Sequence, residues 1–236
     1  MACAAAERCR VSVIVPALNE AGYIRQTLEC LQDMRRRGHE VIVVDGGSQD
    51  ASVALSRPLA DRVIESPAGR ARQMQAGAAI AQGNILWFLH ADTQASRQAD
   101  QRIVDAVINS GRQWGRFDVR FPDGGVLLKG VAFMMNLRSR LTGIATGDQG
   151  MFVFRPLYEC VNGFPQIPLM EDIALSRTLK RYARPLALRD TVASSARRWN
   201  EHGLVRTVVT MWGLRLAYFL GVPPRHLAAY YAVRRT

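Results

Sequence analysis

Short apolar runs alternate with stretches of helical periodicity along the first ninety residues of the chain. Such runs, bounded by turn residues, are typical of buried strands. The predicted strands are 11–15, 41–44, 62–64 and 85–89. The predicted helices between them are a first helix after Asn19, a short helix at 51–57 and a helix at 70–81. This alternation predicts a parallel sheet covered by helices on both faces.

The first helix is expected to take Asn19 as its N-cap, because an Asn side chain can accept a hydrogen bond from a free amide of the first turn. Gly38 offers a stop for the helix. Four apolar residues in between share one helical face, namely Ile24, Leu28, Leu31 and Met34.

The second half of the chain is less regular. The expected elements are helices at 96–110 and 126–141, strands at 116–121 and 151–154, and a helix that begins near Glu171. No repeat, linker or low-complexity segment interrupts this order, so residues 10–200 are predicted to form one domain.

The composition is that of a globular protein, with 48% hydrophobic and 22% charged residues among 236. The four cysteines lack CxxC or metal-ligand spacing, and the first residues lack an apolar run of signal-peptide length. Both features favour reduced thiols in a cytoplasmic protein.

The net charge of +11 is concentrated near the C-terminus. Residues 177–236 contain twelve Arg and Lys but only Asp190 and Glu201 as acidic residues. Such a segment suits an anionic partner, such as a membrane surface or a phosphate-bearing substrate. Alternatively, it forms a solvated arginine-rich surface without a partner. No nucleic-acid reading motif accompanies the charge, so we expect no nucleic-acid partner.

Three polar clusters directly follow predicted strands, at 16–20, 45–50 and 90–93. Ligands of open α/β sheets bind outside the carboxyl ends of the strands. The three clusters therefore predict one binding cleft.

Two of these clusters contain side chains suited to a nucleotide and a metal. Asp45 can accept hydrogen bonds from a base or ribose, or it can satisfy the amides of its own turn. His90 and Asp92 lie two residues apart at a strand end and can face one cleft, where a divalent cation would neutralise a diphosphate; alternatively, Asp92 caps the next helix.

Glu171 and Asp172 open a predicted helix. Carboxylates in a first turn stabilise the helix dipole. A carboxylate held at a cleft can also act as a general base towards an acceptor hydroxyl.

Four segments together resemble, in order and spacing, the family-2 glycosyltransferases with a GT-A fold. The similarity covers about residues 10–200. The segments are VSVIVPALNEAGYIRQTLECL, EVIVVDGGSQD, GRARQMQAGAAIAQGNILWFLHADT and LMEDIALSRTLKR. The resemblance implies an α/β, Rossmann-like mixed sheet of the GT-A type with helices on both faces, followed by C-terminal helices.

The resemblance also implies roles for residues of the first half. Pro16, Ala17 and Glu20 match the loop that lines the nucleotide, and Asp45 matches the aspartate that recognises the base, commonly uracil. Arg72 falls where relatives place a basic or polar residue near the nucleotide.

Further positions match the metal and acceptor motifs of the family. Asp92 matches the last aspartate of the metal-binding DxD motif, with His90 as its partner and Ala91 beside the nucleotide. Asp172 matches the general base of inverting members, and Glu171 supports it. The implied diphosphate and acceptor residues are Asp148, Gln149, Arg198 and Trp199.

Three departures from the family pattern affect these expectations. His90 stands where the first DxD aspartate is expected, Gly46 follows Asp45 where many relatives have a second aspartate, and Ser195 replaces the glutamine of QxxRW. A catalytically degenerate scaffold that binds nucleotide sugars is therefore an alternative. A sugar nucleotidyltransferase fits less well, because residues 16–20 are not a glycine- and arginine-rich loop.

Residues 204–222 have the length of a membrane span but contain Arg206 and Arg215. A charge at the centre of a span costs roughly 2.5–3.5 kcal/mol, so we expect no simple span. One helical face of the segment suits docking on the domain, on a second copy of the protein or on a membrane surface. That face consists of Val205, Val208, Trp212, Leu216 and Phe219.

The sequence thus predicts a glycosyltransferase that uses a nucleotide-diphosphate sugar, UDP-sugar favoured, with Mn²⁺ or Mg²⁺. Its acceptor is unknown, and a lipid-linked or amphiphilic one would suit a membrane-facing tail. The expected parts are a nucleotide half at about 10–95, an acceptor half at about 96–200, and a basic amphipathic extension at 201–236.

Overall fold

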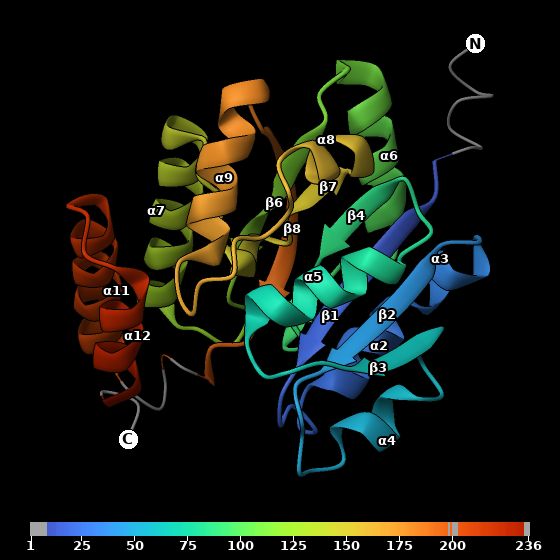
Figure 1. The fold of residues 1–236 in the computed structure, drawn as a ribbon, viewed down its shortest axis with the longest axis horizontal. Helices are drawn as coiled ribbons and strands as arrows, with labels where there is room; N and C mark the ends of the chain where they lie inside the picture. The colour runs from blue at the N-terminus through green and yellow to red at the C-terminus, as the bar shows by residue number, and fades with distance from the viewer. Residues whose placement is uncertain (1–8, 198, 200–202, 234–236) are drawn as a thin grey trace.

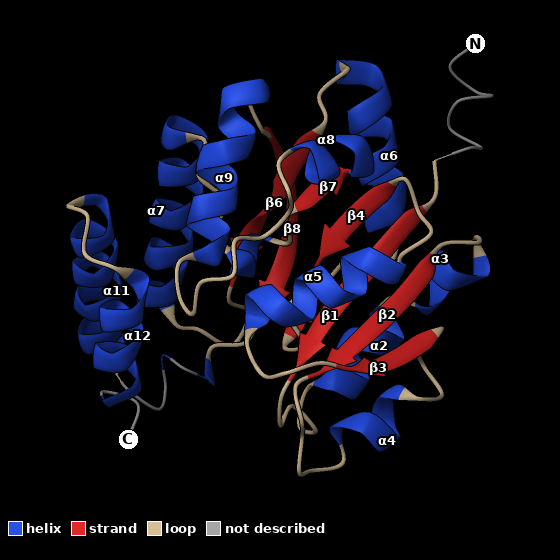
Figure 2. Cartoon of the chain, in the orientation of Figure 1, coloured by secondary structure: helices blue, strands red, loops and turns tan. Residues whose placement is uncertain are grey.

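The computed structural model describes residues 9–197, 199 and 203–233, which form a mixed sheet covered by helices (Figures 1 and 2). The sheet has eight strands in the order β3-β2-β1-β4-β7-β6-β8-β5. The strands are β1 (Val11–Ala17), β2 (Glu40–Asp45), β3 (Arg62–Glu65), β4 (Ile85–Phe88), β5 (Thr93–Gln94), β6 (Trp114–Arg120), β7 (Phe152–Phe154) and β8 (Leu186–Ser194).

The first four strands pair in parallel and confirm the strand prediction for the first half. Strand β7 then runs antiparallel between β4 and β6, and β8 lies parallel to β6. The short β5, which follows the His90–Asp92 loop, pairs with the end of β8. The last part of the sheet therefore returns the chain to the loop after β4.

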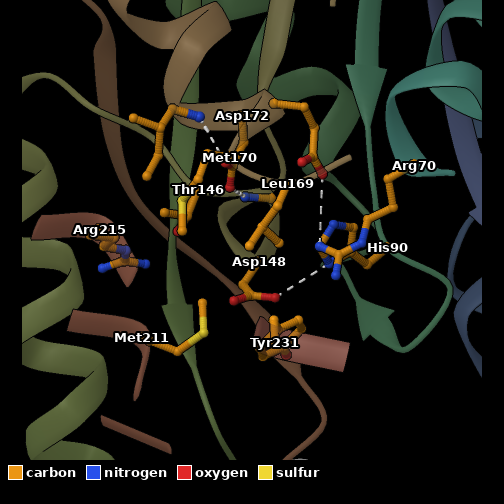
Figure 3. Close-up of a pocket in the computed structure, with 13 residues that line it drawn as sticks. Arg70, His90, Thr146, Asp148, Leu169, Met170, Asp172, Met211, Arg215 and Tyr231 are labelled. Atoms are coloured by element: carbon orange, nitrogen blue, oxygen red, sulfur yellow. Dashed lines mark hydrogen bonds and ion pairs between the residues drawn. The ribbon is translucent and has the colours of Figure 1, made fainter. Parts of the chain in front are cut away.

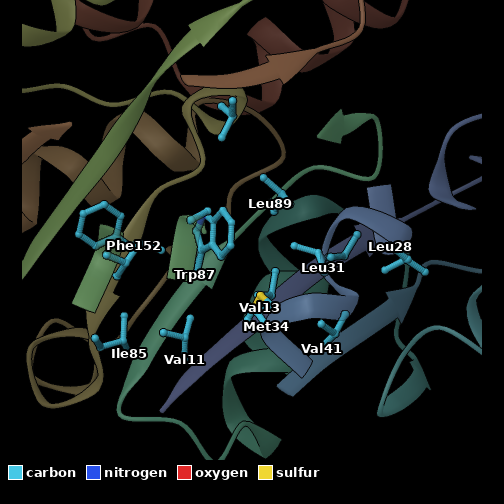
Figure 4. Close-up of a cluster of buried hydrophobic side chains, with 14 of the residues drawn as sticks. Val11, Val13, Leu28, Leu31, Met34, Val41, Ile85, Trp87, Leu89 and Phe152 are labelled. Atoms are coloured by element: carbon cyan, nitrogen blue, oxygen red, sulfur yellow. The ribbon is translucent and has the colours of Figure 1, made fainter. Parts of the chain in front are cut away.

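Alternate residues of the central strands point to opposite faces of the sheet. Val13 and Val41 pack under α2 (Ile24–Cys30), α3 (Gln32–Arg36) and α6 (Ala99–Ser110), in the layer of Figure 4. Ile14 and Ile42 pack under the helices of the other face, which are α5 (Arg70–Ile80), α8 (Arg155–Cys160) and α9 (Glu171–Tyr182). Burial on both faces explains why these strands are continuous apolar runs.

The predicted cap at Asn19 is wrong. Asn19 has a φ of 55°, its Oδ1 accepts a hydrogen bond from Gln49 N at 2.8 Å, and the helix starts only at Ile24. The side chain joins the loops after β1 and β2 instead of capping a helix. The apolar face predicted for this region is nevertheless buried, on two short helices, α2 and α3.

Five further elements complete the described chain. They are α4 (Ser52–Ser56), α7 (Val126–Thr142), the short 3₁₀ helix η1 (Gly147–Gln149), and the C-terminal pair α11 (Leu204–Phe219) and α12 (Pro224–Val233). Figure 1 shows the C-terminal pair at one side of the molecule, next to α7 and α9.

The C-terminal pair packs on the domain, but not through the face expected from the sequence. Leu214 and Leu227 are buried against Ile144, Met170 and Ile173. Four residues of the expected face point outward instead, with Val205, Trp212, Leu216 and Phe219 all more than half exposed. No helix in the described ranges is both long and apolar enough to cross a bilayer.

Candidate active site

Asp45 ends β2 and is almost completely buried. Its Oδ2 accepts hydrogen bonds from the amides of Gly47 and Ser48, both at 2.9 Å. Its Oδ1 is buried and has no partner among the described residues. One oxygen therefore fixes the turn, while the other is left for a ligand, since buried acceptors are rarely unpaired.

The loop after β1 is tied to the loop after β2. Glu20 N donates to Ser52 Oγ at 2.7 Å, and Ala21 N donates to Asp50 Oδ2 at 2.9 Å. Pro16 and Ala17 are buried within β1, and the Ala17 carbonyl accepts a hydrogen bond from Gln73 on α5. The predicted nucleotide residues of the two loops thus form one rigid unit beside Asp45.

The loop after β4 is fixed by its backbone. The buried Ala91 carbonyl accepts a hydrogen bond from Thr27 Oγ1 at 2.8 Å, and the Asp92 carbonyl accepts one from Ser195 N at 3.1 Å. The Asp92 carboxylate lies close enough to Glu20 for its negative charge to raise the pKa of Glu20. The structure thereby brings the first and third strand-end clusters together.

Arg197 links these clusters to the end of β8. Its guanidinium reaches both carboxylate oxygens of Glu20 at 3.2 Å and lies 4.8 Å from the ring centre of Tyr23. Burial raises the pKa of Glu20, Arg197 opposes this shift, and the charge of Asp92 adds to it. The sequence interpretation named the neighbouring Arg198, which lies outside the described residues.

A metal at Asp92 would have few protein ligands. No group of three or more His, Cys, Asp or Glu side chains that could hold a metal occurs in the described part of the chain. His90 faces elsewhere, with Nδ1 3.3 Å from Asp148 Oδ1 and its ring against Gly147. Mg²⁺ commonly binds through one or two carboxylates plus substrate phosphates, and the single carboxylate of Asp92 fits that donor set, since both Glu20 oxygens are held by Arg197.

A pocket opens between the sheet and the C-terminal helices (Figure 3). Its polar lining includes His90, Asp148 and the pair Glu171–Asp172. The C-terminal helices also contribute, through Met211, Arg215 and Tyr231. His90 and the predicted base pair therefore line one pocket, whose far wall belongs to the tail, while Asp92 is not among the lining residues.

Asp172 is held in a fixed orientation at the start of α9. Its Oδ2 accepts a hydrogen bond from Gly147 N at 2.8 Å, and its Oδ1 accepts one from Ile173 N at 2.7 Å. Met170, just before this helix, has a φ of 68°, which is strained for a residue with a side chain. Each carboxylate oxygen keeps a lone pair that can accept a proton.

Glu171 is buried beside Asp172. Burial raises its pKa, the charge of Asp172 raises it further, and Arg70, 3.9 Å away, opposes both. The two adjacent carboxyl groups thus have unlike environments.

Other predicted residues take supporting or peripheral places. Gln149 is fully buried and donates to Asn136 Oδ1 at 3.2 Å, while Trp199 packs on Phe121 with ring centres 5.6 Å apart. Arg72 is exposed on α5, whereas Arg70, two residues earlier on the same helix, lines the pocket.

The pocket residues missed from the sequence include four that come from α5 and the C-terminal helices, namely Arg70, Met211, Arg215 and Tyr231. Arg70 is adjacent to the predicted segment, and the basic tail was recognised as a segment of interest. No local pattern indicates which tail residues turn inward, because that depends on how α11 and α12 dock.

The parallel strands, the antiparallel return and the site at the strand ends define a GT-A-type nucleotide-binding fold. Residues 12–156 match the model of glycosyl transferase family 2, and the chain belongs to this family. The chain therefore combines membership of a glycosyltransferase family with a fold of the GT-A type.

Relatives by sequence are also glycosyltransferases. A glycosyltransferase of Mycobacterium tuberculosis is 35% identical over 114 residues, which are 44% of this chain and 44% of the relative. Glycosyltransferase AglE of Haloferax volcanii is 27% identical over 170 residues, 66% of this chain and 56% of AglE. The matched part of this chain thus covers 44% of the length of the first relative and 56% of the length of AglE.

Solved structures share the fold. Glucosyl-3-phosphoglycerate synthase from Mycobacterium tuberculosis, in complex with Mn²⁺, UDP and glucosyl-3-phosphoglycerate, superposes with a TM-score of 0.67 at 19% identity, over 93% of this chain and 83% of that one. TarS of S. aureus superposes with a TM-score of 0.66 at 19% identity, over 79% and 60%.

Proposed function

We propose that this protein transfers a sugar from a nucleotide-diphosphate sugar, with a UDP-sugar favoured, to an acceptor hydroxyl with inversion. The buried and unpartnered Oδ1 of Asp45 carries the proposal. A carboxylate oxygen at the end of β2 accepts the N–H of a base such as uracil. The UDP bound by glucosyl-3-phosphoglycerate synthase, which shares the fold, supports this choice.

A Mn²⁺ or Mg²⁺ ion at Asp92 would stabilise the negative charge that develops on the leaving diphosphate. The Mn²⁺ and Mg²⁺ complexes of the same synthase support this assignment. The hydrogen bond from Thr27 to the Ala91 carbonyl fixes the backbone next to Asp92, and Arg197 holds Glu20 in an ion pair. These residues bind and orient the donor.

Asp172 acts as the general base in this proposal. Its carboxylate takes the proton of the acceptor hydroxyl, and the acceptor oxygen then bonds to the anomeric carbon as the bond to the diphosphate breaks. The amides of Gly147 and Ile173 hold the carboxylate in one orientation. Glu171, whose pKa is raised by burial and by the charge of Asp172, lies beside the base and 3.9 Å from Arg70.

The exchange Asp172→Asn tests the proposal. An amide cannot accept the hydroxyl proton, so transfer to an acceptor should fall by about 10²–10⁴-fold. Calorimetric titration with UDP and Mn²⁺ should give an unchanged affinity, because Asp45 and Asp92 remain. Glu171→Gln is the matched control, with a much smaller loss. Full turnover in Asp172→Asn would remove this residue from the mechanism.

A nucleotide-sugar-binding scaffold without catalysis is the second candidate. The observation that favours it is His90, which turns towards Asp148 in place of a second carboxylate next to Asp92. A donor-hydrolysis assay with UDP-glucose and Mn²⁺ separates the two functions. Tight UDP binding with no hydrolysis and no transfer would favour the scaffold.

A further inference from the structure

Two arginines meet between α7 and α11, at the border of the pocket. Arg138 comes from α7 and Arg215 from α11, and Arg215 lines the pocket. Burial, then the positive charge of Arg215, lower the pKa of Arg138 to about 10, while the charge of Asp172 opposes them. The two cations therefore lie close together and close to the candidate base.

The hydrogen-bond donors of this pair are not satisfied. Nε and Nη2 of Arg138 and Nε of Arg215 are buried and have no partner among the described residues. A buried charged donor without a partner is costly, and two cations that face each other add repulsion. The packing of α7 against α11 does not by itself explain why both positions are arginines.

An anion between the two side chains would remove both costs. Guanidinium groups bind phosphate oxygens through paired N–H donors, which is the arrangement left open here. Figure 3 shows Arg215 and Arg70 on opposite sides of the pocket, with Asp148 and Asp172 between them. Arg70 comes from α5 in the first half of the chain, whereas Arg215 comes from the C-terminal helix α11, and we assign Arg215 to the acceptor side.

We propose that Arg138 and Arg215 bind a phosphate group on the acceptor and thereby direct its hydroxyl to Asp172. The role of the bound molecule as acceptor rests on the proposed glycosyl transfer, whereas the binding of an anion by the two arginines does not depend on it. The phosphate group belongs either to a water-soluble phosphate ester or to a lipid headgroup. The exposed apolar residues on α7 and α11, among them Phe133 and Trp212, are the reason to test the lipid source.

The first test uses inorganic phosphate and glycerol 3-phosphate as probes in thermal unfolding of the full chain. Either probe should raise Tm at constant ionic strength in chloride, also when UDP and Mn²⁺ already occupy the donor site. Arg138→Met and Arg215→Met should lose this shift and keep their UDP affinity. Arg181→Met, which removes an exposed charge on α9, is the matched control and should keep the shift.

The same variants distinguish an anion site from a structural role. Without a probe, removal of one of two repelling cations should leave Tm unchanged or raise it. A marked fall in Tm for both variants, or an equal phosphate shift in all proteins, would overturn the proposal. Failure of UDP to bind would instead refute the proposed function. The phosphate-induced change in Tm would still show whether the two arginines bind an anion.

The second test identifies the source of the phosphate. Vesicles of phosphatidylcholine with phosphatidic acid should retain the wild-type protein more than either arginine variant if the phosphate sits on a lipid. Equal retention of all variants, with a phosphate shift by glycerol 3-phosphate alone, would assign the site to a soluble ester. A response to neither probe would reject the site.

Discussion

Asp45 shows how one side chain combines a structural and a binding role. Its Oδ2 holds the turn after β2, and its buried Oδ1 is left over. The turn role that the sequence allows is therefore seen at Oδ2, and the proposed function assigns base recognition to Oδ1.

Asp45→Asn separates the two roles. The amide oxygen can still accept from the amides of Gly47 and Ser48, while the NH₂ group replaces Oδ1 and faces the base. UDP, whose uracil presents an N–H, should bind about 10–100-fold more weakly, which corresponds to about 1–3 kcal/mol. CDP, whose ring nitrogen is an acceptor at that position, should lose nothing or gain. Calorimetry measures both, and equal UDP affinity in variant and wild type would remove Asp45 from base recognition.

The sequence predicts side chains at strand ends better than side chains on helices. Asp45, His90 and Asp92 follow buried strands, so the end of the apolar run places them. Arg72 and Arg70 lie on the same helix, and only its rotation on the sheet decides that Arg70 enters the pocket. Periodicity does not settle that rotation, because α5 has small or polar residues on every side.

At the scale of elements, α6 is anchored by one buried carboxylate. Asp100 is almost completely buried and accepts hydrogen bonds from Arg37 Nε at 2.8 Å and Nη2 at 2.7 Å, with His39 Nε2 at 3.1 Å. Burial alone would raise the pKa of Asp100, but these partners hold it well below its usual range. The helix is thereby fastened to the segment between α3 and β2.

Asp100→Asn should lower the free energy of unfolding by about 3 kcal/mol near neutral pH, the cost typical of breaking a buried ion pair. Because the folded-state pKa of Asp100 is depressed, its contribution is present above about pH 4 and is lost as the pH falls through the folded-state value. Urea unfolding at pH 7 and pH 3 should therefore show a smaller difference between the two proteins at pH 3. The same difference at both pH values would contradict this account.

Element prediction succeeds or fails for related reasons. The central strands are buried on both faces, so their apolar runs are visible in the sequence. Strand β8 lies near the edge of the sheet and is exposed at Arg189 and Thr191, so its pattern is mixed and it was not predicted. Helix α11 is apolar nearly all round, and its periodicity therefore selected a face that the structure leaves exposed.

At the scale of the whole molecule, the C-terminal pair completes the pocket. Leu214 and Leu227 attach it to Met170 and Ile173, next to the candidate base. The C-terminal helices therefore pack next to the candidate base, whereas the contacts of Asp45 are all made within the first half of the chain.

Leu214→Ala tests this coupling. The cavity should cost about 2–5 kcal/mol of the packing that holds α11 on the domain. Transfer should fall while UDP affinity stays the same, because donor recognition does not use the tail. Val209→Ala, on the exposed face of the same helix, should change neither quantity. Parallel loss of UDP binding in Leu214→Ala would show that the two halves are not independent.

The far wall of the pocket comes from a segment that supplies no strand to the sheet. In the proposed function, donor recognition and acceptor choice are consequently encoded by separable segments of the chain. Exchange of the last two helices between relatives would give chimaeras with the same donor specificity and a changed acceptor specificity. Divergence within the family can follow the same route, with a tail replaced as a unit while the nucleotide-binding half is inherited unchanged.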